Sequence, residues 1–266
     1  MARLAQRLLL TGAAGNIGRD LRTRLAAHCQ ALRVSDAADV GPARPGEECV
    51  TARLEDAQAM DQLLAGVDAV VHMGGVPEER SFDSILSANI VGLRNLYESA
   101  RRHGVRRLVV ASSLHVTGFY RQDEVVDAHM PARPDGYYAI SKLYGENLGR
   151  YYFDRFGIET VSLRIGSYRV EPLTRRELSS WISAEDMERL VLASLRAPVV
   201  GHTIVYGVSA NASSWWDNRS AQHLGYQPQD DASAYAARLN ALEPTLDLNN
   251  PATVFQGGLF VRNEPQ

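Results

Sequence analysis

The chain has 266 residues, 45% of them hydrophobic, and a formal net charge of −3 at pH 7. This length and composition suit one large α/β domain, or one domain with a small addition. The charge balance does not indicate a nucleic-acid partner, and no apolar run is long enough to cross a membrane. The two cysteines, Cys29 and Cys49, lack metal-ligand spacing, so we expect neither a disulfide framework nor a metal site.

The first five residues are too short, and too soon followed by a strand, to form a secretory signal. We therefore expect a cytoplasmic protein without a membrane partner. The first predicted element is a strand over residues 7–11.

A glycine-rich turn follows this strand. Gly12, Gly15 and Gly18 are spaced by three and lead into a helical pattern. Glycine permits the tight turn and lets backbone N–H groups approach a pyrophosphate at the positive end of the helix. The alternative is an ordinary turn with incidental glycines, but its place after the first strand favours a dinucleotide site. We expect Gly12, Gly15, Asn16, Ile17 and Gly18 to contact the cofactor.

The second predicted strand, residues 31–36, ends in Asp36, which lies 18 residues after Gly18. A dinucleotide-binding fold places there the acid that binds the ribose hydroxyls of adenosine. This favours NAD over NADP, because a 2′-phosphate would meet a like charge. Arg33 is close enough in sequence to leave NADP open, and a solvated aspartate at a strand end is the alternative interpretation.

Strands and helices then alternate to the end of the chain. We expect strands at 48–52, 68–73, 107–111, 159–165 and 202–206, and helices after Asp56, at 82–103, at 138–156 and at 183–195. This alternation predicts a Rossmann-type doubly wound parallel sheet. We expect residues 1–166 to form the NAD-binding domain and residues 167–266 a small C-terminal substrate-binding region packed on it, as one folding unit. The last sixty residues would cover the carboxyl ends of the strands, where such sheets bind ligands.

Tyr138 and Lys142 are the strongest catalytic candidates. Their spacing of four places both side chains on one face of a helix. A phenol titrates near ~10, and a nearby ammonium together with an oxidised nicotinamide would lower that pKa, so that the tyrosine serves as a base. The alternative is a tyrosine in the core with its lysine in water. Gly74 and Gly75, after the fourth strand, would let the backbone run close beneath a bound cofactor.

The glycine turn, the pair Ser112-Ser113 at a strand end and the run from Tyr138 to Lys142 together resemble the extended short-chain dehydrogenase/reductase superfamily, also called NAD-dependent epimerases/dehydratases. The resemblance implies that Ser113 completes a Ser/Tyr/Lys catalytic set. It also implies NAD contacts from Leu54 and Asn89.

A closer resemblance, to uronate dehydrogenases, covers nearly the whole chain. It rests on Ala111-Ser112-Ser113-x-His115, Pro134-Asp135-Gly136-x-Tyr138-x-x-Ser141-Lys142, Arg164-Ile165-Gly166-Ser167, Ser209-Ala210-Asn211, Trp215-Trp216-Asp217-Asn218 and Phe255-Gln256-Gly257-Gly258. It implies oxidation by NAD of the C1 hydroxyl of a cyclic hexuronic acid such as glucuronate or galacturonate, giving an aldarolactone. By the same resemblance Ser113, His115, Ser167 and Arg176 contact substrate, and Arg176 pairs with its carboxylate.

Three positions depart from the uronate dehydrogenase pattern. Leu114 replaces an asparagine, Pro77 replaces a serine, and Arg53 replaces the acid that meets adenine. Because an unpaired buried hydroxyl costs roughly 1–3 kcal/mol, the first two changes imply that the sugar is held differently or carries fewer hydroxyls.

Other functions stay open at this point. One is a nucleotide-sugar epimerase or dehydratase, another is a dehydrogenase for a different small sugar or polyol, and a third is an NAD-binding regulator without catalysis. The Ser/Tyr/Lys set argues against the regulator, which needs no base. The resemblance also implies that the apolar sides of the helices at 82–103 and 137–156 form the seam of a homo-oligomer.

Overall fold

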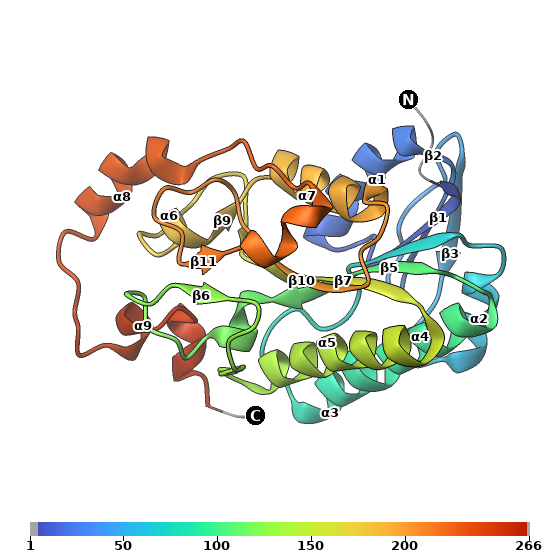
Figure 1. Cartoon of the computed structure of the whole chain (residues 1–266), viewed down its shortest axis with the longest axis horizontal. Helices are drawn as coiled ribbons and strands as arrows, with labels where there is room; N and C mark the ends of the chain where they lie inside the picture. The colour runs from blue at the N-terminus through green and yellow to red at the C-terminus, as the bar shows by residue number, and fades with distance from the viewer. Residues whose placement is uncertain (1–4, 265–266) are drawn as a thin grey trace.

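The structure, a computed structural model, describes residues 5–264, and its core is one seven-stranded parallel sheet (Figure 1). The strand order is β10-β7-β5-β4-β1-β2-β3. These strands are β1 (Ala5–Thr11), β2 (Cys29–Asp36), β3 (Glu47–Thr51), β4 (Ala69–His72), β5 (Arg107–Ser113), β7 (Glu159–Ile165) and β10 (His202–Gly207). All seven predicted strands are therefore confirmed, and so is the doubly wound fold class. The N-terminal segment 1–4, on which we based the absence of a signal, lies outside the described residues.

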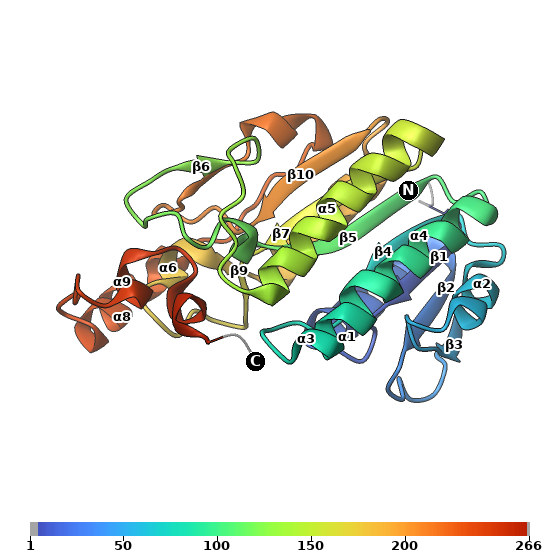
Figure 2. The same cartoon turned by 90° about the horizontal axis from the view of Figure 1, so that it is seen from below.

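Helices cover both faces of this sheet because its strands are apolar on both sides. Leu8 and Leu10 of β1 belong to a buried cluster under α1 (Asn16–Leu25) and α7 (Ala184–Arg196). Leu9, between them, belongs to the cluster under α2 (Ala57–Leu64), α4 (Leu93–Arg102) and α5 (Tyr137–Phe156). Successive side chains of a strand point to opposite faces, so one apolar run supplies both cores. Figure 2 shows α4 and α5 side by side over the second face.

The helix predicted over 82–103 is one helical stretch with a widened middle. α3 (Phe82–Ile85) leads into a π-helical segment over residues 86–92 and then into α4. Gly92 lies against Leu54, and the amide of Asn89 reaches back to Val76, bonding both its N–H and its carbonyl oxygen. Single π-helical turns are frequent at functional sites, and here the turn carries Asn89 to the loop after β4.

The carboxyl ends of β1 and β4 meet at the point where the strand order reverses. Gly12, just after β1, has a φ of +74°, and a Cβ on it would overlap the backbone of Met73 and Gly74 after β4. Only glycine allows two strand ends to approach so closely. Ligands of open α/β sheets bind in the crevice at such a switch point, so the sheet itself locates the site.

The C-terminal part completes the sheet and, together with residues 126–127, forms a separate group of short elements. β10 and α7 extend the Rossmann core, so residues 167–266 share the main sheet with residues 1–166, and the domain boundary stays a prediction. The short elements gather at one end of the molecule (Figure 2). They are β6 (Val126–Asp127), β8 (Ser167–Tyr168), α6 (Glu177–Ser180), β9 (Trp181–Ile182), β11 (Trp216–Asp217), α8 (Ala236–Leu242), α9 (Pro251–Val254) and the 3₁₀ turn Gly258–Arg262. Within residues 5–264, no helix combines the length and hydropathy needed to cross a bilayer.

Candidate active site

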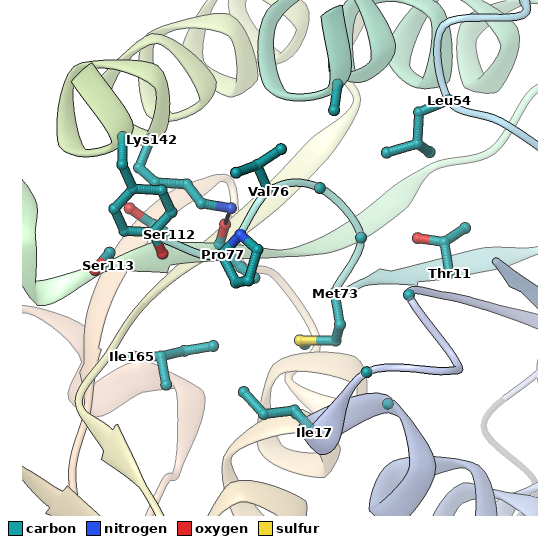
Figure 3. Close-up of a pocket in the computed structure, with 18 of the residues that line it drawn as sticks. Thr11, Ile17, Leu54, Met73, Val76, Pro77, Ser112, Ser113, Lys142 and Ile165 are labelled. Atoms are coloured by element: carbon teal, nitrogen blue, oxygen red, sulfur yellow. Dashed lines mark hydrogen bonds between the residues drawn. The ribbon is translucent and has the colours of Figure 1, made fainter. Parts of the chain in front are cut away.

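A cleft of about 890 Å³ opens at the carboxyl ends of the sheet strands, and the predicted site residues meet there. It is lined from β1 and the glycine turn, from the ends of β2 to β5, from α5 and from β8, with Arg176 and Phe260 added by the C-terminal part. Figure 3 shows Ser113 and Lys142 on one side of the cleft and Thr11 and Leu54 on the other. Every residue that we predicted for cofactor or substrate lines this cleft, except Asn89.

The glycine turn fits a pyrophosphate. Gly15 is the N-cap of α1 and offers no side chain to the first turn, so the N–H groups of residues 16–18 face the cleft without a capping partner. A Cβ on Gly18 would overlap the carbonyl oxygen of Gly12, which keeps α1 close against β1. Unpaired amides at the positive end of a helix form an anion site, and a dinucleotide supplies the anion.

Asp36 is fixed at the ribose end of the cleft. Its Oδ2 accepts the N–H of Ala14 and its Oδ1 accepts the N–H of Ala38, each at 3.0 Å. Arg33 is buried and bonds Glu48 at 2.9 Å as well as the carbonyl oxygen of Leu63 at 2.6 Å. Because these hydrogen bonds hold the Arg33 guanidinium outside the cleft, it does not neutralise a 2′-phosphate beside Asp36. The site therefore fits the ribose hydroxyls of NAD.

Residues 52–55 line the end of the cleft at which we expect adenine. The guanidinium of Arg53 is largely exposed and bonds Glu55 at 2.6 Å, so its charge is paired. Leu54 and Gly74 touch: a Cβ on Gly74 would come within 3.3 Å of Leu54 Cδ1. Asn89 lies behind this wall, where its amide bonds Val76 and also Ser141 at 2.9 Å. Its proposed contribution to cofactor binding is therefore through the shape of the loop after β4.

Tyr138, Lys142 and Ser113 line the middle of the cleft. The Nζ of Lys142 donates to the carbonyl oxygen of Ala111 at 3.0 Å and lies 5.6 Å from the centre of the Tyr138 ring. Burial raises the pKa of Tyr138 to about 12, against a smaller opposing effect of the Ser113 hydroxyl. Burial also lowers the pKa of Lys142 to about 8. In the protein without nicotinamide, desolvation thus outweighs the Ser113 hydrogen bond, and the lowering of the phenol's pKa expected with the bound cofactor stays a prediction.

A buried ion pair supports the strand that carries Ser113. Arg164 of β7 makes two hydrogen bonds of 2.9 Å with Glu146 of α5, and both side chains are 3% exposed. Glu146 also accepts the hydroxyl of Ser112 at 2.6 Å, and Arg164 donates to the Tyr206 hydroxyl at 2.8 Å. Breaking a buried pair of this kind leaves an uncompensated charge, so the network fixes α5 against the end of β5.

The substrate half of the cleft combines His115, Ser167 and Arg176. His115 lies in the 3₁₀ turn Leu114–Thr117 directly after β5, and its Nδ1 is 2.6 Å from Oδ2 of Asp135. The Ser167 hydroxyl is 2.9 Å from that of Ser180. Both side chains come from segments that leave the carboxyl ends of central strands, so they project over the same opening.

Arg176 is a half-buried cation with an unused donor. Its Nε donates to the carbonyl oxygen of Gln256 at 2.7 Å, whereas its NH2 nitrogen is buried without a hydrogen-bond partner among residues 5–264. Burial lowers its pKa to about 10. A buried guanidinium nitrogen without a partner is costly, and a carboxylate entering the cleft would satisfy it.

Sequence reasoning missed two residues that shape this site. Phe260 stacks on His115 with ring centres 3.8 Å apart, and Glu79 accepts the N–H groups of Tyr137 and Tyr138 at 3.0 and 2.9 Å. Glu79 thus caps α5, the helix that carries the candidate base. Phe260 lies two residues beyond the quoted run Phe255 to Gly258, which was the only signal for it. Nothing in the sequence around Glu79 indicates the distant helix.

Residues 8–169 match the model of the NAD dependent epimerase/dehydratase family. The uronate dehydrogenase of Pseudomonas syringae pv. tomato is 52% identical over 260 residues, which cover 97% of this chain and 94% of that protein. The crystal structure of uronate dehydrogenase from Agrobacterium tumefaciens is 48% identical, with a TM-score of 0.95 over 99% of this chain and 100% of that one. A mutant of that protein complexed with NAD gives the same score and identity over 98% and 100%.

This chain therefore belongs to the NAD dependent epimerase/dehydratase family. Within it, the identity over nearly the full length of both chains places it in the group of uronate dehydrogenases.

Proposed function

We propose that this chain is an enzyme that oxidises the C1 hydroxyl of a cyclic hexuronic acid with NAD, giving an aldarolactone. The observation that carries the proposal is the unpaired, buried NH2 nitrogen of Arg176 in the same cleft as Ser113, Tyr138 and Lys142. A carboxylate on the substrate satisfies that nitrogen and fixes the orientation of the sugar ring. The relatives named uronate dehydrogenases support the same substrate class.

The chain's own groups provide the proton chemistry. An oxidised nicotinamide bound in the cleft supplies the acceptor for the hydride that leaves C1. The phenolic oxygen of Tyr138 takes the hydroxyl proton; because burial raises the pKa of the phenol to about 12 in the protein alone, its ionisation depends on the positive charges of Lys142 and of the bound nicotinamide. Ser113 hydrogen-bonds the reacting oxygen. Lys142, held by Ala111, keeps a positive charge beside the phenol and stabilises its ionised form.

The two apolar replacements are consistent with a sugar acid that is held by fewer direct hydrogen bonds. Leu114 is 2% exposed and packs in a cluster with residues such as Tyr206 and Trp216, so little of it faces the cleft. Pro77 is exposed on the loop that borders the cleft. Glucuronate and galacturonate differ at one hydroxyl, and neither side chain at these two positions offers a donor or acceptor to distinguish them.

The test is a turnover assay. Purified protein mixed with NAD and D-glucuronate or D-galacturonate should produce NADH, seen as new absorbance, and Tyr138→Phe should abolish this while NAD still binds. Silence toward a broad panel of sugar acids and aldoses, together with turnover of nucleotide sugars and no net NADH, would replace this proposal with an epimerase or dehydratase.

Self-association and location belong to the same proposal. Phe82, Ile140, Tyr151 and Phe156 are each more than 40% exposed, and all lie on α3 or α5. A second copy of the chain would cover these side chains in a helix seam, which light scattering would detect as a doubled mass.

We also propose a cytoplasmic location, because an enzyme of this kind would use the NAD of the cytoplasm.

A further inference from the structure

His115 is paired with a carboxylate that none of the catalytic roles above uses. The side chain of Asp135 is completely buried, and its Oδ2 lies 2.6 Å from Nδ1 of His115. The other oxygen, Oδ1, is also buried and has no hydrogen-bond partner within the described chain. Asp135 precedes α5 by two residues, so it is built into the entrance of the helix that carries Tyr138.

Two glycines enclose this carboxylate. A Cβ on Gly118 or on Gly257 would overlap Oδ2 of Asp135, and the N–H of Gly257 donates to the carbonyl oxygen of Gly118 at 2.8 Å. The backbone therefore closes around a side chain of aspartate length and leaves no room for a longer one. On the far side of the imidazole, Phe260 stacks on His115 with an interplanar angle of 24°. The ring is thus held on its edge and on its face.

The pairing decides which nitrogen of His115 is available. An ionised carboxylate only accepts hydrogen bonds, so Nδ1 carries the proton and Nε2 keeps a lone pair. No hydrogen bond of Nε2 is formed within residues 5–264, and the ring lines the cleft beside Ser113, Tyr138 and Arg176. Burial lowers the pKa of His115 and Arg176 adds to this, whereas Asp135 and Glu79 oppose it. The ring is therefore neutral at pH 7, and Nε2 is an acceptor.

We propose that Asp135 is a positioning residue that fixes His115 in its Nδ1–H tautomer, so that Nε2 accepts a hydrogen bond from a hydroxyl of the bound sugar acid. This inference deepens the proposed function and rests on it. Arg176 recognises the carboxylate of the substrate, and the Asp135–His115 pair recognises a hydroxyl on the same ring. Carboxylic acids that lack this hydroxyl would leave Nε2 unpaired and bind less well.

Nitrogen-15 NMR of the imidazoles tests the tautomer without turnover. Among the seven histidines, the His115 signals are assigned by their loss in His115→Ala. We expect a protonated Nδ1 and an unprotonated Nε2 in the wild type. Asp135→Asn offers a donor as well as an acceptor to Nδ1, so the Nε2–H form should gain population. A wild-type ring that is protonated at Nε2 alone would overturn the proposal, whatever the enzyme's substrate proves to be.

Kinetics test whether the pair acts on substrate. Asp135→Asn should raise KM for the uronate at least about fivefold, the equivalent of one hydrogen bond, with the affinity for NAD unchanged. In a His115→Ala background the same change should have no further effect on KM, because Asp135 acts through the ring. Asp154→Asn, an exposed partner of Arg150, is the matched control and should behave as wild type. An equal loss from Asp135→Asn with and without His115 would show a merely structural role.

The two proposals fail in distinguishable ways. If the wild type turns over no sugar acid, the proposed function is wrong, yet the tautomer of His115 can still be read. If uronates are oxidised but Asp135→Asn leaves both the tautomer and KM unchanged, only the positioning role is wrong. Thermal unfolding of each variant shows whether it is still folded at the assay temperature, so that a higher KM is not mistaken for partial unfolding.

Discussion

Lys142 lies beside Tyr138 without binding it: its Nζ is 5.6 Å from the centre of the phenol ring and donates to the carbonyl oxygen of Ala111. The side chain is half-buried, and partial desolvation lowers the pKa of its ammonium to about 8. The protein therefore keeps a cation in a place where water solvates it incompletely. Such an arrangement has a cost in folding stability that can be measured.

Lys142→Met should stabilise the protein at neutral pH. An unfolded lysine holds its proton up to about pH 10.5, whereas the folded one loses it near 8, so stability rises with pH between these values. Below pH 8 the full cost, at most about 3 kcal/mol, is present. The variant should be more stable than wild type in urea unfolding at pH 7, and the difference should shrink toward pH 10. A difference that does not change with pH would contradict this origin.

His72 should make the protein sensitive to acid. Its Nδ1 is 2.6 Å from the Thr11 hydroxyl, and burial lowers its pKa from 6.5 to about 3. Below pH 6.5 His72 is protonated in the unfolded chain but not in the folded protein. The free energy of unfolding therefore falls as the pH falls toward 3, by up to about 5 kcal/mol. His72→Gln should reduce this fall. The unfolding temperatures of wild type and variant are measured at pH 7 and pH 5. If both proteins lose the same number of degrees, His72 is not the cause of the acid sensitivity.

Arg176→Met should weaken substrate binding and leave the cofactor alone. A charge-assisted hydrogen bond contributes about 1.5–3 kcal/mol, so kcat/KM for the uronate should fall by roughly 10- to 150-fold. The affinity for NAD, measured by fluorescence titration, should stay the same. Arg175→Met is the matched control, because within residues 5–264 that neighbouring side chain bonds only the carbonyl oxygen of Glu243. If Arg176→Met and Arg175→Met lowered kcat/KM equally, Arg176 would not bind the substrate carboxylate.

Pro77→Ser should improve the binding of hexuronates. The residue is exposed on a loop that lines the cleft, so a serine there adds a donor and acceptor without disturbing the core. One added neutral hydrogen bond contributes about 1 kcal/mol, or roughly a fivefold lower KM. Leu114→Asn is expected to differ, because it places an amide in the apolar cluster with Tyr206 and Trp216 and should lower the unfolding temperature. An unchanged KM in Pro77→Ser would mean that the sugar lies away from this loop.

The sequence predicted the sheet and the cofactor half of the site because these depend on local patterns. Apolar runs define the seven strands of the main sheet, and the spacing of Gly12, Gly15 and Gly18 defines the turn that follows the first strand. Asp36 follows from its distance to that turn. In each case the interacting backbone lies within one strand–turn–helix unit.

The substrate half could not be predicted in the same way because its contacts join distant segments. Glu79 bonds Tyr138 across 59 residues, and Arg176 bonds Gln256 across 80. Asp135 stands in a run shared with uronate dehydrogenases, but only the folded chain shows that it meets His115. The burial that raises the pKa of Tyr138 in the protein alone could not be read from the spacing of two residues, and the lowering expected with a bound nicotinamide stays a prediction.

Because Arg176 bonds residue 256, near the end of the chain, the two halves of the site are completed at different times during synthesis. Translation proceeds from the amino end, so all seven sheet strands, the last of which ends at Gly207, leave the ribosome before residues 256–260 exist. The glycine turn and Asp36 are therefore synthesised long before Phe260, which lines the other side of the cleft. The segment that is expected to complete the substrate side of the cleft is thus among the last parts of the chain to be synthesised.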